Sequence, residues 1–165
     1  MAGVASFFQL GTDLDPGSRQ SQAEEHVPVA QAGSRRESGE DRRDFFIERD
    51  GLRFAGVHLI IDLHEAERLD DLAHVERALR DCIAASGASL LHIHLHHFTP
   101  NGGVSGVAVL AESHISVHTW PECGFAAFDV FMCGNTRPHR TVEVLKRAFR
   151  PGRISVCEHL RGGDR

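Results

Sequence analysis

The composition of the chain and the spacing of its apolar residues change near residue 50, and this change constrains the fold more than any other feature. Residues 1–50 are rich in Gly, Ser, Gln, Arg and Glu, and residues 34–44 (SRRESGEDRRD) contain no apolar side chain. Such a segment buries too little surface to offset the entropy lost on folding. Beyond it, apolar residues recur at regular spacings. We therefore expect one folded domain at residues 51–165 and a flexible extension at residues 1–50, whose aromatic pairs at 7–8 and 45–46 are candidates for docking.

The periodic part of the chain predicts two helices separated by strands. Apolar residues between Leu72 and Ile83 repeat with helical spacing, Asp70 or Asp71 can cap the start, and Gly87 can end the helix. A second helix begins at Pro138. Short apolar runs bounded by turns predict strands at residues 54–63, 90–98, 104–111, 115–119, 125–132 and 153–159.

The order of these elements is strand, helix, several strands, helix and strand, which is typical of an α+β fold. We expect a two-layer sandwich, with an antiparallel-rich sheet and both helices on one of its faces. The other face of the sheet would be bare in a monomer. A second copy of the chain can cover such a face, so we also expect pairing as a homodimer.

Composition excludes several kinds of partner. The net charge of −5 and the pI of about 6.2 give no basic field for nucleic acid. No apolar run approaches the roughly 18–20 residues of a membrane span, and no basic segment opens a signal peptide. We therefore expect a cytoplasmic protein with no nucleic-acid or membrane partner. The four cysteines form no Cys-x-x-Cys pair and are expected to be reduced thiols.

The densest chemical signal lies at residues 102–134. It contains GVSGV at 103–107, AESHISVHTWPE at 111–122 and AAFDVFMCG at 126–134. Together these motifs resemble the prokaryotic S-adenosylmethionine decarboxylase proenzymes, and a weaker similarity runs from about residue 56 to 162.

This resemblance implies a chain that cuts itself between Glu112 and Ser113, a bond we expect to sit at a bend. The Ser113 hydroxyl would attack the Glu112 carbonyl, and elimination would leave a pyruvoyl group at position 113. The β chain would be residues 1–112 and the α chain residues 113–165. A pyruvoyl group forms a Schiff base with the substrate and accepts electrons, so no external cofactor is expected. The single lysine, Lys146, argues against pyridoxal phosphate chemistry.

The resemblance also assigns roles to five further residues. His118 is the proton acceptor of processing, and Ser105 assists processing by hydrogen bonding to the developing oxyanion. Cys133 protonates the substrate carbanion after CO2 leaves. Glu122 binds the ribose hydroxyls, and Phe98 stacks on adenine or lies near the sulfonium.

Three functions remain open on the sequence. The first is decarboxylation of S-adenosylmethionine, which supplies aminopropyl groups for spermidine synthesis. The second is pyruvoyl-dependent decarboxylation of a free basic amino acid, ornithine or arginine, but Glu122 favours a substrate that has a ribose. The third is a non-enzymatic protein, either a zinc-binding or scaffold domain or an uncleaved regulatory partner of an active homologue. His92, His94 and His96 share one face of a strand, but neighbours about 7 Å apart converge poorly on one ion, so no metal is expected.

Overall fold

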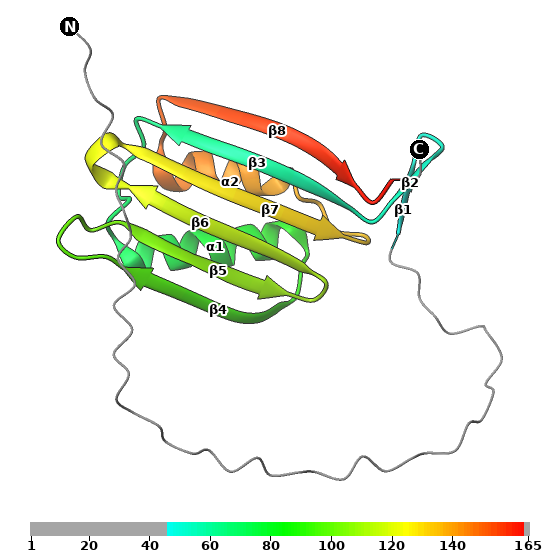
Figure 1. The fold of residues 1–165 in the computed structure, drawn as a ribbon, viewed down its shortest axis with the longest axis horizontal. Helices are drawn as coiled ribbons and strands as arrows, with labels where there is room; N and C mark the ends of the chain where they lie inside the picture. Colours follow the sequence, from blue (N-terminus) through cyan, green and yellow to red (C-terminus); the bar gives the residue numbers. More distant parts are fainter. Residues whose placement is uncertain (1–45, 164–165) are drawn as a thin grey trace, which may run out of the picture. The chain divides into compact units, whose positions relative to one another are not determined.

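The structure, a computed structural model, describes residues 46–163 and has a six-stranded sheet with two helices on one face (Figure 1). The sheet order is β4-β5-β6-β7-β3-β8, and every neighbouring pair is antiparallel. Its strands are β3 (Gly56–His64), β4 (Leu90–His97), β5 (Val104–Leu110), β6 (Ser113–Trp120), β7 (Phe125–Cys133) and β8 (Arg153–Arg161). The predicted α+β class and the antiparallel sheet are confirmed.

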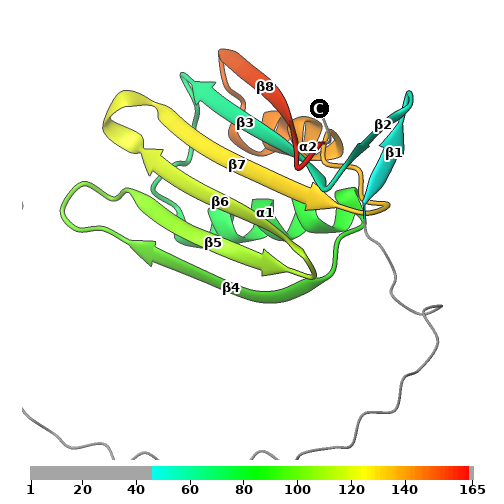
Figure 2. The same ribbon diagram turned by 45° about the vertical axis from the view of Figure 1, so that its right-hand side comes forward.

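Buried and exposed side chains alternate along the strands, so one face of the sheet lies against the core and the other is uncovered. Leu59, Ile61 and Leu63 of β3 are fully buried under the helices, whereas Ile60 between them is 39% exposed on the opposite side. We call this opposite side the open face, and no helix of the described chain covers it (Figure 2). By register it carries His92, His94 and His96 of β4, Ser105, Val107 and Val109 of β5, His114, Ser116, His118 and Trp120 of β6, Asp129 and Phe131 of β7, His58 and Ile60 of β3, and Cys157 and His159 of β8.

Capping and turn residues mark where the helices begin and end. The first, α1 (Leu72–Ser86), is capped by Asp71, whose carboxylate accepts a hydrogen bond from the backbone N–H of His74 at 2.9 Å. Gly87 ends it with a φ of 75°, the left-handed conformation that suits glycine. The second, α2 (Arg140–Phe149), follows the turn that starts at Pro138. Neither helix is long and apolar enough to span a membrane.

A two-stranded hairpin precedes the sheet. It pairs β1 (Ile47–Arg49) with β2 (Leu52–Phe54), and the buried ring of Phe54 joins the hydrophobic core. The boundary predicted at residue 50 therefore falls in the turn of this hairpin. The rest of the predicted extension, residues 1–45, lies outside the described residues.

Candidate active site

The Glu112–Ser113 bond lies at a tight turn between β5 and β6. Leu110 pairs with Ser113 across the turn, which leaves only Ala111 and Glu112 to reverse the chain. Glu112 has a φ of 57°, in the left-handed region that a residue with a side chain rarely adopts. Such a conformation costs about 1–2 kcal/mol. The expected bend at this bond is confirmed, and the backbone there is strained.

Ser113 is held by the neighbouring strand. Its side chain is buried, and its hydroxyl oxygen accepts a hydrogen bond from the backbone N–H of Cys133 at 3.1 Å. Cys133 is the last residue of β7, which pairs with β6. The sheet register thus joins two predicted site residues that are 20 positions apart in the sequence.

The environment of Cys133 favours its protonated form. Partial burial raises the pKa of the thiol, and the nearby Glu112 carboxylate raises it further. The hydrogen bond with Ser113 acts in the opposite direction but is the smallest of the three influences. A thiol with a raised pKa keeps its proton at neutral pH, as a proton donor must.

A cavity of about 600 Å³ opens beside this turn. Glu112 and Cys133 contribute to its wall, together with Phe46, Ser89 and Thr136. Its volume lies within the range of about 300–1,000 Å³ typical of small-molecule sites. The predicted cleavage point is therefore next to a space large enough for a substrate.

Ser105 and His118 form a second group. They face each other on neighbouring strands, and the Ser105 hydroxyl lies 2.8 Å from Nδ1 of His118. The ring of Trp120 stands 6.1 Å from that of His118, centroid to centroid. Ser105 therefore contacts Nδ1 of the His118 ring and not Nε2.

The second group borders a cavity of about 360 Å³. Phe98, Ser105, Trp120 and Glu122 line it, and Glu122 lies in the short helical turn η1 (Pro121–Cys123). The Phe98 side chain is 48% exposed, with the ring of His96 against it at 4.5 Å. Aromatic rings and a carboxylate around one space can hold a planar base and a diol.

The two groups lie at opposite ends of the sheet. Ser113 is the first residue of β6 and Trp120 the last, and the turns that flank them sit at opposite ends in Figure 1. His118 is five residues from Ser113, which is about 17 Å along a strand at about 3.4 Å per residue. Ser113 also points to the helix side, whereas His118 lies on the open face. Within one chain, His118 does not reach the bond at Glu112.

A polar network that the sequence analysis missed occupies the open face between the two groups. The Ser116 hydroxyl donates to Asp129 at 2.9 Å, and Nε2 of His58 is 3.4 Å from the other oxygen of Asp129. Arg161 reaches Nδ1 of His58 at 3.1 Å. Burial lowers the pKa of His114, and His58 lowers it further, so His114 is neutral at physiological pH. Contacts across four strands build this network, so no single sequence motif reveals it.

The histidines of β4 do not gather around a common point. His92, His94 and His96 share the open face, as the alternation predicts. No three metal-binding side chains cluster within residues 46–163.

Comparison with known proteins identifies the family. The model of the S-adenosylmethionine decarboxylase family matches residues 57–162. The S-adenosylmethionine decarboxylase proenzyme of Thermomicrobium roseum is 45% identical over 112 residues, which cover 67% of this chain and 97% of that protein. The proenzyme of Methanococcus maripaludis strain C7 is 46% identical over 114 residues, 67% of this chain and 93% of that one.

A solved structure shows the same fold. The crystal structure of the adenosylmethionine decarboxylase from Aquifex aeolicus superposes with a TM-score of 0.60 at 31% identity, covering 66% of this chain and 92% of that one. Fold and sequence together place the chain in a class of small α+β decarboxylase proenzymes. It belongs to the S-adenosylmethionine decarboxylase family, so the resemblance seen in the motifs is confirmed.

Proposed function

We propose that this chain cuts itself between Glu112 and Ser113, forms a pyruvoyl group at Ser113, and decarboxylates S-adenosylmethionine. The observation that carries this proposal is the strained Glu112–Ser113 turn, with the Ser113 hydroxyl held by Cys133 beside a cavity of about 600 Å³. The cut would yield a β chain of residues 1–112 and an α chain of residues 113–165 from one precursor. The product would donate aminopropyl groups in spermidine synthesis.

Processing follows from the chemistry of serine. The Ser113 oxygen bonds to the Glu112 carbonyl carbon, the C–N bond breaks, and the amide becomes an ester with a free amine at 113. Loss of the Ser113 α-proton then breaks the ester and releases the β chain, which now ends in the main-chain carboxylate of Glu112. This elimination leaves dehydroalanine at position 113. The imine tautomer of dehydroalanine reacts with water, releases ammonia and gives the pyruvoyl group. Strain at Glu112 favours the first step because breaking the amide relieves it.

The proton transfers require His118, and a second copy of the chain can supply it. We propose that two αβ units pair through their open faces. The two-fold axis would lie between the two sheets and run across the strands near Ser116. The strands of the second copy would then run in the opposite direction to those of the first. This pairing therefore brings the Ser105–His118 pair of one copy to the end of the sheet at which the Glu112–Ser113 turn of the other lies. Exposed apolar side chains on this face support burial there, at Ile60, Val109 and Trp120.

The same pairing joins the two cavities into one site. The cavity beside Ser113 would take the amino-acid half of the substrate. The partner copy's cavity would take the adenosine half, with Glu122 binding the ribose hydroxyls and Phe98 stacking on the base. The pyruvoyl carbonyl supplies the electron sink for loss of CO2, and Cys133 then delivers a proton to the substrate carbon.

Release of CO2 from carboxyl-labelled substrates tests this function. The purified, processed protein is expected to release label from S-adenosylmethionine and not from ornithine or arginine. Release from ornithine or arginine alone would contradict the proposed substrate while leaving the pyruvoyl chemistry in place.

Replacing Cys133 separates processing from turnover. Cys133→Ala is expected to be cut at 112/113, because the backbone N–H that holds Ser113 remains. Its turnover is expected to fall by roughly 10²-fold or more and to decline further during the reaction, because protonation at the wrong atom inactivates the enzyme. Wild-type turnover in Cys133→Ala would remove this residue from the role of acid.

The pH dependence of turnover follows from the raised pKa of Cys133. The thiol donates only when it is protonated, so activity is expected to fall as pH rises through its pKa in the folded protein. Because burial and Glu112 raise this pKa, the fall should come at a higher pH than for an ordinary thiol. The profile of kcat against pH measures this, and an alkaline fall below the ordinary thiol range would contradict the assignment.

A further inference from the structure

The hairpin of β1 and β2 lies before the segment that the family model matches. The family match begins at residue 57, whereas the hairpin covers residues 47–54. The hairpin thus precedes the segment that the family model matches, and its position can give the domain a property of its own.

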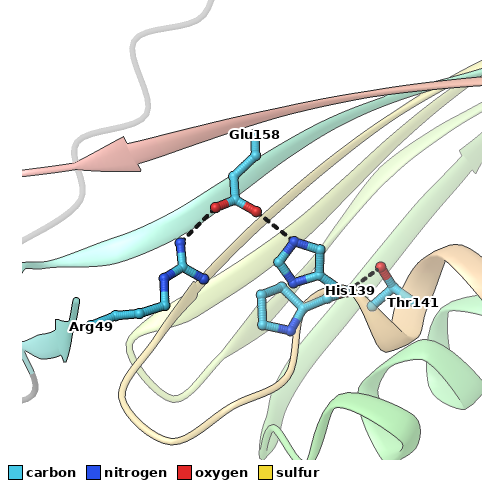
Figure 3. A network of polar contacts seen from close by, with 5 residues as sticks. Arg49, His139, Thr141 and Glu158 are labelled. Carbon is cyan, nitrogen blue, oxygen red and sulfur yellow. Dashed lines mark hydrogen bonds and ion pairs between the residues drawn. The ribbon is translucent and has the colours of Figure 1, made fainter.

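Contacts from both strands fix the hairpin to the domain. Arg49 of β1 donates to Glu158 of β8 at 2.7 Å, and Nε2 of His139 lies 2.5 Å from the other oxygen of Glu158 (Figure 3). From β2, the ring of Phe54 is 1% exposed in the core. The hydrogen bond from Arg49 holds the pKa of Glu158 below its usual value, and His139 adds to this effect although partial burial opposes it. Glu158 is thus ionised at neutral pH and can hold both partners.

With the hairpin held by these contacts, Phe46 lines the cavity beside the cleavage point. Phe46 immediately precedes β1 and borders the same space as Glu112 and Cys133. The guanidinium of Arg53 lies 4.8 Å from the centre of its ring, which steadies the ring from the hairpin side. The cavity therefore combines an aromatic ring, a carboxylate and a thiol, three groups that come from separate parts of the chain.

We propose that Phe46 is a substrate-binding residue, through which the N-terminal hairpin packs an aromatic wall against the amino-acid half of S-adenosylmethionine. The inference rests on the proposed function, because that half of the substrate must lie beside residue 113 to react. Aromatic rings attract cations and exclude water, and this half of the substrate carries both an ammonium and the sulfonium. Phe46 thus contributes to affinity, whereas Ser113 and Cys133 carry the chemistry.

Steady-state kinetics of matched variants test the proposal. Phe46→Ala is expected to be cut normally and to raise the KM for S-adenosylmethionine about 10-fold, with kcat changed less than twofold. Phe46→Tyr keeps the ring and is expected to restore the wild-type KM, whereas Phe46→Leu is not. Leu52→Ala alters an exposed side chain of the same hairpin and is expected to leave KM unchanged.

A double-mutant cycle tests whether the anchorage acts through Phe46. Glu158→Ala removes the hydrogen bond that holds Arg49, so it is expected to loosen β1 and raise KM. Phe46→Ala/Glu158→Ala is expected to be no worse than Phe46→Ala alone. Calorimetric binding of S-adenosylmethionine to the uncut Ser113→Ala protein gives a readout that needs no activity, and adding Phe46→Ala is expected to weaken it. An unchanged KM and Kd in the Phe46→Ala variants would overturn the proposal. Failure of the wild-type chain to cut itself would instead count against the proposed function.

Discussion

Ser113→Ala is expected to give one uncut chain of 18.2 kDa with no measurable decarboxylase activity. Alanine has no hydroxyl to attack the Glu112 carbonyl, so neither the ester nor the pyruvoyl group can form. Denaturing electrophoresis and a CO2-release assay measure the two effects.

Ser155→Ala is the matched control, because Ser155 is an exposed serine on β8, away from the turn. It is expected to be cut and active. Cleavage at 112/113 in the Ser113→Ala protein would contradict the mechanism, since another group would then be breaking the bond.

Mixing two inactive variants is expected to restore cleavage. His118→Ala and Ser113→Ala should each remain uncut when expressed alone. In a mixed dimer, however, the intact Ser113 of the first variant meets the intact His118 of the second. With equal amounts and random pairing, about half of the His118→Ala chains should be cut. Distinct tags and intact-mass spectrometry identify which chain is cleaved.

This result depends on the separation of about 17 Å between Ser113 and His118 within one chain. Cleavage of His118→Ala expressed alone would show that His118 is not the required base. Mixed dimers that form but remain uncut would show that the partner's His118 does not act at the turn. A mixture of Ser105→Ala with Ser113→Ala gives a second test of the same pairing, because Ser105 is hydrogen bonded to His118.

The sequence predicted the fold well because the signals that define it are local. The helical spacing between Leu72 and Ile83 requires only one helix and its buried face, and Asp71 and Gly87 mark its ends. Strand alternation likewise needs only neighbouring residues. The hairpin at residues 47–54 escaped this reasoning because its strands are three residues long and it lies within a polar segment. Its stability comes from Phe54 and from distant partners such as Glu158, which no local pattern reveals.

The candidate site could be predicted as a set of residues but not as an arrangement. Motif similarity named Ser113, His118 and Cys133, and the structure brings Ser113 and Cys133 together. His118 lies on the opposite face of β6 from Ser113, because the strand continues without a turn between the two. The polar network around Asp129 depends on the order of strands in the sheet, which the linear pattern does not fix.

Intact-mass spectrometry of the purified protein shows whether the chain cuts itself and forms a pyruvoyl group. We expect two fragments divided after Glu112, with the 53-residue fragment from position 113 beginning in a pyruvoyl group instead of serine. Adding S-adenosylmethionine and cyanoborohydride should then increase the mass of that fragment by the reduced substrate. A single chain of 18.2 kDa, unchanged by either reagent, would contradict both self-cleavage and the pyruvoyl group.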